Sequence, residues 1–589
     1  MFKGHPKGLY ALALANTGER FGYYTMLAVF ALFLRENFGL AAGTAGAIYS
    51  TFLGLVYFMP LVGGILADKF GFGRMVTTGI MVMFGGYLLL SAPLGGESVA
   101  MIAMMAALVL ISVGTGLFKG NLQVMVGNLY DDPKYADKRD SGFSLFYMAI
   151  NVGSLFAPTT AVGIKRWAET SLGYSSNDAY HFSFMVACVA LILSILIYYL
   201  FRRTFRHVEG GKKKGEAAQV VDNLTPAETK QRIIALCLVF AVVIFFWMAF
   251  HQNGLTLTYF ADEFTSTNAF GFETMLFNVW NLALVIIAVY ATFSIFQSES
   301  AKGKLFSGVL STAVLAFLVY RAMGIEATAQ IAVAAPIFQQ FNPFYVVALT
   351  PVSMAIFGAL ARKGKEPSAP RKIAYGMLVA AIGFVVMAVG SQGLNTPNAQ
   401  ARAIAVNKAA TFAQSCHTVA LDFEALSEAD GKANADIKAA QDFMGKLTDK
   451  TRPIFAEVYN LECTALTNED AEVVAAAQTS LEAIKAENKE TRTSAYWLIF
   501  TYLILTFAEL LLSPMGISFV SKVAPPKLKG LMMGGWFVAT AIGNMLVAVG
   551  GFLWAGLPLW SVWTVFIVLC LLSALFMFIM MKRLESVTK

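Results

Sequence analysis

The chain has 589 residues, of which 57% are hydrophobic and 14% are charged, and its mean hydropathy is +0.62. This composition excludes a soluble globular protein of the same length and predicts a polytopic helical protein embedded in a lipid bilayer. The formal net charge of +7 does not indicate nucleic acid binding, because the basic residues cluster between the apolar stretches. The polar start "MFKGHPKG" is not a cleavable signal, so we expect the first apolar stretch to direct insertion.

Fourteen apolar stretches have the length that an α-helix needs to cross a hydrocarbon core of about 30 Å. Six lie in the first third of the chain, near 8–35, 44–67, 75–95, 99–128, 142–165 and 181–201. After a polar linker, eight more lie near 233–260, 274–297, 305–323, 341–361, 373–390, 495–522, 530–554 and 560–582. The sequence therefore predicts an all-α membrane protein with six helices, a linker and eight helices.

The short loops between these stretches differ in their content of lysine and arginine. Basic residues are concentrated in the linker, in "ARKGKEPSAPRK" (361–372), in "SKVAPPKLKG" (521–530) and in the C-terminal "MKRLESVTK". Loops that alternate with these, such as "LGGES" and "TSTNAFGFET", contain no basic residue. Because basic loops stay on the cytoplasmic side, we expect both termini in the cytoplasm and the protein in a cell membrane, a bacterial inner membrane being the expected one.

The predicted helices divide the chain into five parts. They are an N-terminal six-helix bundle (1–201), a cytoplasmic linker (202–232), the first part of a C-terminal bundle (233–391), an insert (392–494), and the last three helices with a cytoplasmic tail (495–589). The insert is polar, and its segment "DAEVVAAAQTSLEAIKAENKETR" predicts a small helical hairpin or bundle outside the cell. An exported compartment permits a disulfide between Cys416 and Cys463 of the insert, with two unlinked thiols as the alternative.

Four ionisable residues lie deep inside predicted spans. At 1.5 Å per residue, Glu19 and Arg20 lie about 17 Å into the first helix, Lys119 about 15 Å into the fourth and Glu509 about 20 Å into the third-last. A charge at such a depth costs roughly 2.5–3.5 kcal/mol on insertion scales, so an isolated one should not persist. The four could lock helices together by pairing, but charges at one depth in both halves more often mark a substrate or ion pathway.

Polar and aromatic residues at similar depth indicate a hydrated cavity around these charges. The polar candidates are Asn151, Asn342 and Ser513. Aromatic residues in spans usually only pack, yet six are candidates for the cavity wall: Tyr23, Tyr24, Tyr57, Tyr147, Trp247 and Trp536. We predict neither an enzyme nor a metal site, because the sequence has no metal-ligand cluster, no phosphate-binding glycine loop and no Ser–His–Asp spacing.

Eight short motifs follow one another along the chain. They are "GERFGYYTM" (18–26), "GGILADKFGFGR" (63–74), "GTGLFKGN" (114–121), "FYMAINVGSLFAP" (146–158), "FFWMAFHQNG" (245–254), "FNPFYVVALTP" (341–351), "AELLLSP" (508–514) and "PPKLKGLMMGGWF" (525–537). In this order they resemble the motifs of the proton-coupled oligopeptide transporter (POT/PTR) family of the major facilitator superfamily. The resemblance implies a major facilitator fold, in which two six-helix bundles rock about a site at the membrane midplane.

The resemblance also implies roles for individual residues. In the family, a peptide carboxylate is held at the positions that match Arg20 and Lys119, and the peptide amino group meets the position that matches Glu509. Glu19 would exchange an ion pair with Lys119 for a proton as substrate binds, so Glu19, Arg20 and Lys119 are the predicted proton-coupling residues. The other predicted substrate-binding residues are Tyr23, Tyr24, Tyr57, Asn151, Trp247, Asn342, Ser513 and Trp536.

Three positions depart from the family pattern. Asn16 stands where the family motif usually has a first Glu, which removes one titratable carboxylate and leaves the proton stoichiometry open. Leu27 and His251 stand where relatives commonly have an Arg and a Glu near the outer ends of their helices, so this chain lacks both charges of such a gate. His251 is either a pH-dependent group or a neutral cavity residue, and we favour the neutral one. Asp68 and Arg74 complete the predicted gate residues.

Two predicted spans, within about 274–323, have no counterpart in that motif order. They fall between helices seven and eight of the family pattern, and we expect them to pack at the periphery without a transport role. The insert falls between helices nine and ten, where animal members of the family carry an external domain. Recruitment of substrate or of a partner and simple shielding of the transporter all remain open as its role.

The sequence therefore predicts a secondary active transporter that imports di- and tripeptides with protons as the coupling ion and with no other cofactor. A second hypothesis keeps the fold but changes the activity, to transport of another small anion or zwitterion or to peptide uniport with weak or absent proton coupling. A third hypothesis is a membrane receptor or scaffold that acts through the insert. The charges within the membrane argue against the third, because a mere anchor would be more stable without them.

Overall fold

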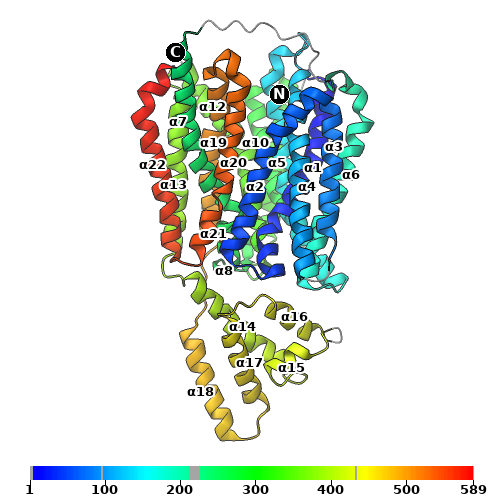
Figure 1. Cartoon of the computed structure of the whole chain (residues 1–589), viewed down its shortest axis with the longest axis vertical. Coiled ribbons are helices and arrows are strands. Elements are labelled where there is room, and N and C mark those ends of the chain that lie inside the picture. Colours follow the sequence, from blue (N-terminus) through cyan, green and yellow to red (C-terminus); the bar gives the residue numbers. More distant parts are fainter. Residues whose placement is uncertain (1–3, 95–96, 211–223, 432–433, 588–589) are drawn as a thin grey trace.

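The computed structural model describes residues 4–94, 97–210, 224–431 and 434–587. Of the predicted linker at 202–232, residues 211–223 therefore lie outside the described part of the chain. Figure 1 shows a layer of long, roughly parallel helices and a smaller helical body, the insert, that projects from one end of that layer. Both chain ends lie at the opposite end of the layer, so the termini and the insert occupy opposite faces.

The N-terminal bundle contains six long helices. They are α1 (Lys7–Phe38), α2 (Ala42–Phe70), α3 (Phe72–Ser91), α4 (Glu97–Asn128), α5 (Arg139–Ser171) and α6 (Ser176–Leu200), with short 3-10 turns η1 (Ala136–Lys138), η2 (Arg202–Thr204) and η3 (Arg206–Val208). α1 ends at Gly39, whose φ of +61° is a left-handed conformation that glycine adopts without strain. α6 begins at Ser175, because the hydroxyl of this residue accepts a hydrogen bond from the Asp178 amide.

The C-terminal bundle is built from eight helical segments. They are α7 (Pro226–Phe250), α8 (Thr256–Phe264), α12 (Phe341–Arg362), α13 (Ala369–Gly390), α19 (Tyr496–Val523), α20 (Lys529–Met545), α21 (Ala548–Trp554) and α22 (Leu559–Ser586), with η7 (Pro526–Leu528) before α20. α7 starts with a capping box between Thr225 and Glu228 and with Pro226 at its first position. The 3-10 turn η4 (His251–Gly254) joins α7 to α8, so the two helices form one span of 39 residues.

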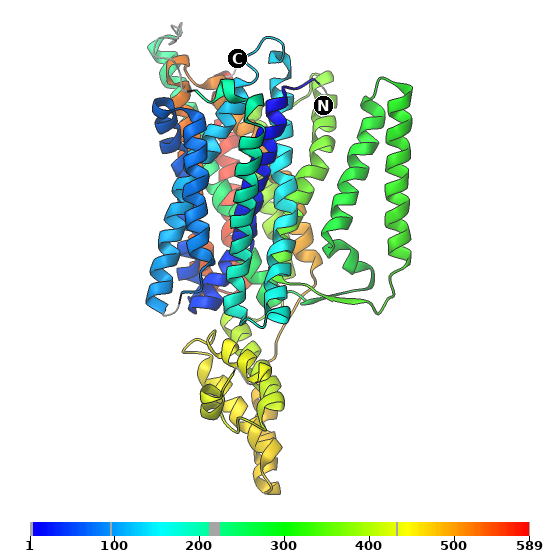
Figure 2. The same cartoon turned by 90° about the vertical axis from the view of Figure 1, so that its right-hand side faces the viewer.

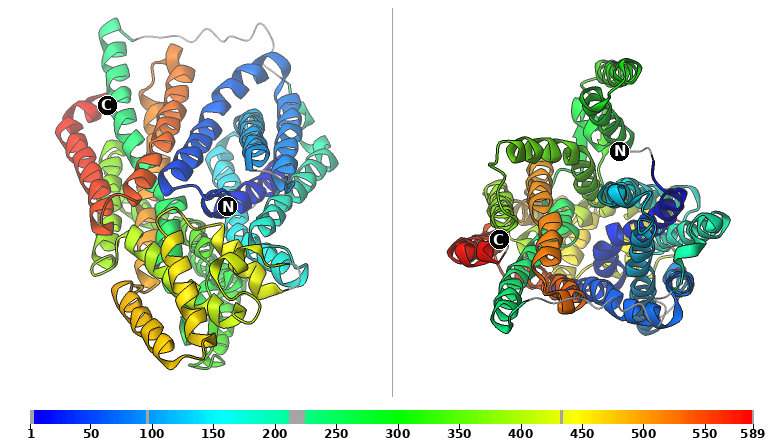
Figure 3. Two further views of the ribbon diagram at one scale, coloured as in Figure 1. Left: turned by 60° about the horizontal axis from the view of Figure 1, so that its bottom comes forward. Right: turned by 90° about the horizontal axis from the view of Figure 1, so that it is seen from above.

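A helical hairpin, α10 (Val279–Gln297) and α11 (Ala301–Met323), interrupts the C-terminal bundle between α8 and α12. Short elements connect it: β1 (Asn268–Phe270), η5 (Gly271–Glu273), α9 (Thr274–Phe277), β2 (Gln330–Ala332) and η6 (Ala335–Gln340), with β1 and β2 antiparallel and Ala269 opposite Ile331. Figures 2 and 3 show the hairpin projecting from the side of the layer, and only 11% of the α11 span is buried. The predicted peripheral position of the two extra helices is confirmed.

Thirteen of the fourteen predicted spans are confirmed, in the predicted order, because thirteen helical segments among the described residues are long and apolar enough to cross a membrane. α1 is not among them, but its 32 residues cover the remaining predicted span and run parallel to the other helices in Figure 1. Exposed apolar side chains such as Ile65, Ile102, Leu196 and Ile579 cover the outer surface of the layer, as expected for helices that contact lipid.

The insert folds as the predicted small helical bundle. Its helices are α14 (Pro397–Cys416), α15 (Phe423–Glu428), α16 (Ala435–Met444), α17 (Arg452–Thr467) and α18 (Ala471–Glu487). They enclose an apolar core of their own, separate from that of the membrane layer, in which Phe455, Val458 and Tyr459 are fully buried. The insert is therefore a second packed body joined to the C-terminal bundle by the connections after α13 and before α19.

The two insert cysteines are free thiols, so the structure does not contain the predicted Cys416–Cys463 disulfide. Both side chains are completely buried, and the Cys463 sulfur lies 3.8 Å from the Ala420 carbonyl oxygen. Burial raises the pKa of Cys463 to about 11, which keeps its thiol protonated and unreactive at neutral pH. Apolar packing, rather than a covalent bond, holds α14 against α17.

Candidate functional site

The first pair of midplane charges is held on α1. Cβ atoms added to Gly18 and Gly22 would lie 3.2 Å from the Ala190 oxygen and 3.1 Å from the Ala187 Cα, so the two glycines let α1 pack closely on α6. The residues that follow Gly18 are almost fully buried: Glu19 is 1% exposed and Arg20 is 2% exposed. Nε and Nη2 of Arg20 donate to the two oxygens of the Glu19 carboxylate, so the two charges compensate each other locally.

The third charge is positioned by the crossing of α2 and α4. A Cβ added to Gly63 would lie 2.1 Å from the Gly116 carbonyl oxygen, which only glycine at this contact permits. Near this crossing, the Lys119 ammonium lies 4.1 Å from the centre of the Tyr57 ring. It is also close enough to Glu19 and Arg20 to interact with both electrostatically. The expected Glu19–Lys119 ion pair is not formed, because Arg20 occupies the Glu19 carboxylate.

The aromatic residues beside these charges form part of the same site. The Arg20 guanidinium lies 4.8 Å from the centre of the Tyr23 ring, and the Tyr23 and Tyr24 rings meet edge to face at 5.2 Å. Tyr57 and Tyr24 lie within electrostatic range of the Glu509 carboxylate on the opposite bundle. Tyr24 and Tyr57 therefore lie near charged groups of both bundles, and contact of the three tyrosines with a substrate stays a prediction.

The fourth charge, Glu509, belongs to α19 and is 8% exposed. The Asn342 side-chain amide of α12 donates to Glu509 Oε2 at 3.0 Å and to Thr506 Oγ1 at 3.1 Å. Glu509 thus has neutral partners from its own bundle but no ion pair among the described residues. The sequence analysis missed Thr506, although its place three residues before Glu509 on the same helix face could have indicated it.

Tyr147 of α5 connects the two halves of the site. Its hydroxyl donates to Glu509 Oε1 at 3.5 Å, across the interface between the bundles. The side chain is nevertheless 47% exposed, so packing does not enclose this contact. Tyr147 thus links the anion of the C-terminal bundle to the N-terminal bundle, which holds the two cations.

Four further predicted binding residues lie around the site with different surroundings. Asn151 donates to the Tyr147 carbonyl at 3.0 Å and so bonds within its own helix. The Trp247 indole nitrogen is buried without a hydrogen-bond partner, which leaves this donor available to a ligand. Trp536 packs directly on Gly516, where no side chain would fit, and Ser513 is half-buried one turn after Glu509. Among these four residues, Trp247 is therefore the one best suited to bind a ligand, through its unpaired indole N–H group.

The four predicted gate residues lie in different surroundings, and their role as a gate stays a prediction. Leu27 is buried in the apolar core. His251 was expected near the outer end of its helix, but the span continues through η4 and α8, so the His251 ring lies within the layer against Trp247 and Tyr57, near Lys119. Asp68 and Arg74 are exposed at the turn between α2 and α3, on the face of the termini, and no ion pair joins them in the described structure.

No group of three or more His, Cys, Asp or Glu side chains within the described residues could hold a metal ion. The chemistry that these residues can perform is recognition of a ligand with separated charges. An anionic group fits Arg20 and Lys119, and a cationic group fits Glu509 and the hydroxyl and amide oxygens beside it.

A sequence model of the POT family matches residues 74–225, 309–448 and 463–551, which together make up more than half of the chain. The chain belongs to the POT family. Its relatives include an uncharacterized transporter, YclF, of Bacillus subtilis, 27% identical over 93% of this chain and 88% of that protein. A peptide transporter, YePEPT, of Yersinia enterocolitica is 26% identical over 100% of this chain and 97% of that protein. A di-/tripeptide transporter of Lactococcus lactis is 28% identical over 66% and 76%.

Solved structures of POT family members share the fold. A crystal structure of peptide transporter POT in complex with sulfate matches with a TM-score of 0.63 at 20% identity, covering 100% of this chain and 96% of that one. A POT family transporter in complex with 5-aminolevulinic acid also matches with a TM-score of 0.63, at 18% identity over 100% and 98%. The protein is thus an all-α, multi-pass membrane transporter with the predicted major facilitator architecture.

Proposed function

We propose that this POT family protein imports di- and tripeptides together with protons by alternating access. The observation that carries the proposal is the placement of Arg20 and Lys119 on one bundle and of Glu509, without an ion pair among the described residues, on the other, with Tyr147 joining the two bundles at Glu509. A short peptide is a zwitterion, so its carboxylate matches the two cations and its amino group matches Glu509. Relatives named peptide and di-/tripeptide transporters support the same substrate class.

Proton coupling follows from the ion pair on α1. A peptide carboxylate that binds Arg20 competes with Glu19 for the guanidinium. A buried carboxylate that loses its cationic partner takes up a proton more readily, so substrate and proton binding favour each other. Release of the peptide restores the Glu19–Arg20 pair and expels the proton. We also propose that the termini face the cytoplasm and the insert faces outward, which agrees with the basic loops on the face of the termini.

The test is uptake of labelled dialanine into proteoliposomes, with and without an inward proton gradient. Accumulation above equilibrium only with the gradient supports proton-coupled import. Equilibration of dialanine to the same level with and without the proton gradient would support a uniporter. The missing carboxylate at Asn16 would then account for the lost coupling. No entry of peptide under either condition would overturn the assignment of peptides as substrates.

A further inference from the structure

An ion pair that the sequence analysis did not predict joins the two bundles on the face of the insert. Arg35, near the end of α1, pairs with Glu263, near the end of α8. The Arg35 guanidinium also lies 4.6 Å from the centre of the Tyr259 ring, and the Trp554 indole donates to Glu263 Oε2 at 3.1 Å. The Glu263 side chain is only 9% exposed, so this pair is enclosed and held by aromatic neighbours.

Two glutamine contacts also join the two bundles. Gln339 donates to the Ala28 carbonyl of α1 at 3.0 Å, and Thr159 of α5 donates to Gln340 Oε1 at 3.0 Å. Both contacts join the N-terminal bundle to η6 of the C-terminal bundle. The ion pair is therefore not the sole polar connection between the bundles in the described structure, and separating the bundles at η6 must break these contacts too.

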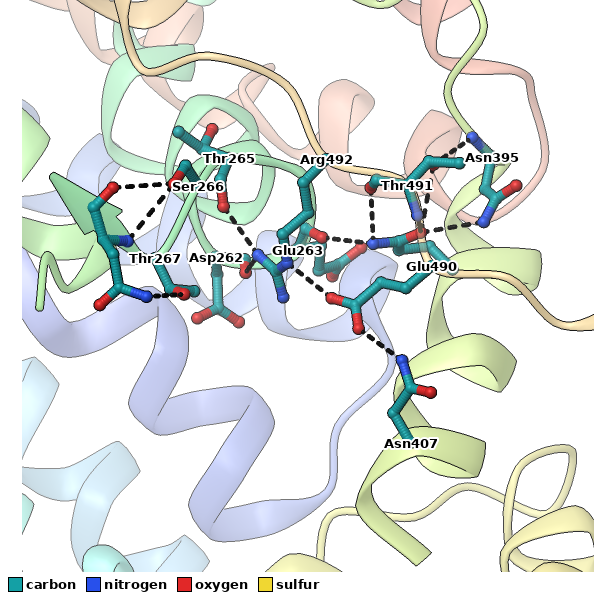
Figure 4. A network of polar contacts seen from close by, with 12 residues as sticks. Asp262, Glu263, Thr265, Ser266, Thr267, Asn395, Asn407, Glu490, Thr491 and Arg492 are labelled. Carbon is teal, nitrogen blue, oxygen red and sulfur yellow. Dashed lines mark hydrogen bonds and ion pairs between the residues drawn. The ribbon is translucent and has the colours of Figure 1, made fainter. Parts of the chain in front are cut away.

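The insert is anchored to the C-terminal bundle right next to Glu263. Figure 4 shows the Arg492 guanidinium at the end of α8, where it donates to the carbonyl oxygens of Asp262 at 3.2 Å and Thr265 at 2.7 Å. The Gln400 amide at the start of α14 donates to the Glu263 carbonyl oxygen at 2.7 Å. Because these bonds are to backbone atoms and both connections of the insert run to α13 and α19, the insert and the C-terminal bundle form one body at this point.

The other side of the insert contacts the N-terminal bundle. The Lys446 ammonium, after α16, lies 2.8 Å from Glu36 Oε2, and Glu36 is the residue next to Arg35. Two more contacts are made around α16: Lys438 donates to the Gly173 carbonyl at 2.7 Å, and Asp442 accepts from the Ser176 amide at 3.3 Å. Although burial lowers the pKa of Lys446, the Glu36 carboxylate together with Asp262 and Asp442 raises it by more, so the ammonium stays charged. We call these three contacts the strap contacts.

We propose that Arg35 and Glu263 form the gate on the insert face and that the insert is a strap that keeps this gate closed. The inference rests on the proposed transport function, because alternating access requires the bundles to separate on that face. Since the insert moves with the C-terminal bundle, opening must break the Arg35–Glu263 pair and the strap contacts in the same step. The pair lies about 12 Å closer to the insert face than Leu27, at 1.5 Å per residue along α1.

A covalent link across the strap tests whether it must open. In a background without the five native cysteines, Glu36→Cys with Lys446→Cys is treated with a short, reducible, thiol-specific crosslinker, because the cysteines replace long side chains that meet only at their ends and a direct disulfide needs Cα atoms within about 7 Å. The crosslink is expected to lower dialanine uptake at least about tenfold, with recovery on reduction. The matched control is Glu462→Cys with Lys485→Cys, another ion pair, at 2.5 Å, that lies entirely within the insert. Crosslinking of the control should leave uptake unchanged. Full uptake by the crosslinked strap variant would overturn the proposal.

A second measurement needs no peptide and therefore separates this proposal from the proposed function. Spin labels on exposed Val99, at the start of α4, and exposed Trp560, at the start of α22, report the distance between the bundles on the insert face. Arg35→Ala and Lys446→Ala should each increase the population with the longer distance several-fold. The exchange Arg35→Glu with Glu263→Arg should restore the original distribution.

An unchanged distance distribution in both Arg35→Ala and Lys446→Ala would overturn the gate and the strap. Lys446→Ala changes a residue on the surface of the insert, so it keeps the test valid if Arg35→Ala fails to fold. If no variant and not even the unaltered chain takes up peptide, the proposed function fails, whereas the distance measurement still decides whether Arg35 and Glu263 hold the bundles together.

Discussion

The two halves of the midplane site balance their charges in different ways. In the N-terminal bundle, Arg20 is neutralised by the adjacent Glu19, and Lys119 rests on the Tyr57 ring. In the C-terminal bundle, Glu509 receives hydrogen bonds from neutral groups and has no ion pair among the described residues. One half therefore carries a net positive charge and the other a net negative charge, although neither leaves a charge without a polar or aromatic neighbour.

This difference explains how the halves can separate and still bind one ligand together. Each half is stabilised mainly by contacts within its own bundle, so no ion pair between Glu509 and the two midplane cations has to be broken when the bundles separate at the midplane. A zwitterion can bridge the two halves, because it supplies one charge to each of them. The predictions below test this asymmetry.

The largest effect is expected for Lys119→Ala, which removes a cation from the positive half. Loss of a buried charge partner costs about 2–5 kcal/mol, so concentrative uptake of dialanine should fall about 30-fold or more. Lys304→Ala, an exposed lysine of the peripheral hairpin, is the matched control and should behave like the unaltered chain. Normal accumulation by Lys119→Ala would remove this residue from the mechanism.

The negative half should matter only for ligands with an amino group. Glu509→Gln keeps an acceptor for Asn342 but removes the charge, so affinity for dialanine should fall about 10- to 100-fold, the range for a hydrogen bond to a charged group. N-acetylated dialanine, which has no ammonium, should lose little. Inhibition constants for both compounds measure the difference, and equal weakening would show that Glu509 does not contact the amino group.

The contact of Lys119 with Tyr57 should contribute a smaller amount. Tyr57→Leu removes the aromatic face beneath the ammonium, and a loss of about 1 kcal/mol corresponds to an uptake roughly fivefold lower. Tyr57→Phe keeps the face and should retain most of the uptake. If Tyr57→Phe is as impaired as Tyr57→Leu, the hydroxyl of Tyr57, rather than its ring, carries the effect.

A second carboxylate in the positive half should change proton coupling more than affinity. Asn16 is 3% exposed and lies one turn before Glu19 on α1, so Asn16→Glu places a new acid next to the ion pair. Uptake between pH 6 and pH 8 should then vary roughly two- to threefold more than in the unaltered chain, because a second proton must bind. An identical pH profile would show that this position plays no part in coupling.

The smallest effect is expected for the peripheral hairpin, which belongs to neither half. Asn281 and Arg321 hydrogen-bond at 2.6 Å, so a short Gly-Ser link between them can replace residues 282–320 without moving the remaining chain. Uptake by this shortened protein should stay within about twofold, since few of the removed residues are buried. A correctly inserted but inactive protein would assign the hairpin a role in transport.

Some features of the site follow from local sequence. The depth of Glu19, Lys119 and Glu509 could be counted along each helix, because a helix rises by a fixed distance per residue. Which charged residues form ion pairs with one another could not be derived in this way. Glu19 pairs with Arg20 rather than with Lys119, because the outcome depends on how closely α1, α2 and α4 approach one another.

The gate on the insert face shows the same limit. Arg35, Glu36 and Glu263 lie near helix ends, where charges are common in membrane proteins and give no indication of a specific partner. Lys446 belongs to another body of the chain altogether. Only the docking of the insert brings Lys446 to Glu36 and thereby shows that the insert touches both bundles.

The membrane spans, the polar insert, its helical character and the depth of the four midplane charges could be read from the amino-acid sequence, because hydrophobicity and helical rise are local, additive properties. The pairing of the charges, the free thiols of the insert and the Arg35–Glu263 ion pair between the bundles emerge only from the folded arrangement. Those outcomes depend on helix crossings and on the packing of segments far apart in the chain. The partner of a charged residue can therefore be identified only once that packing is known.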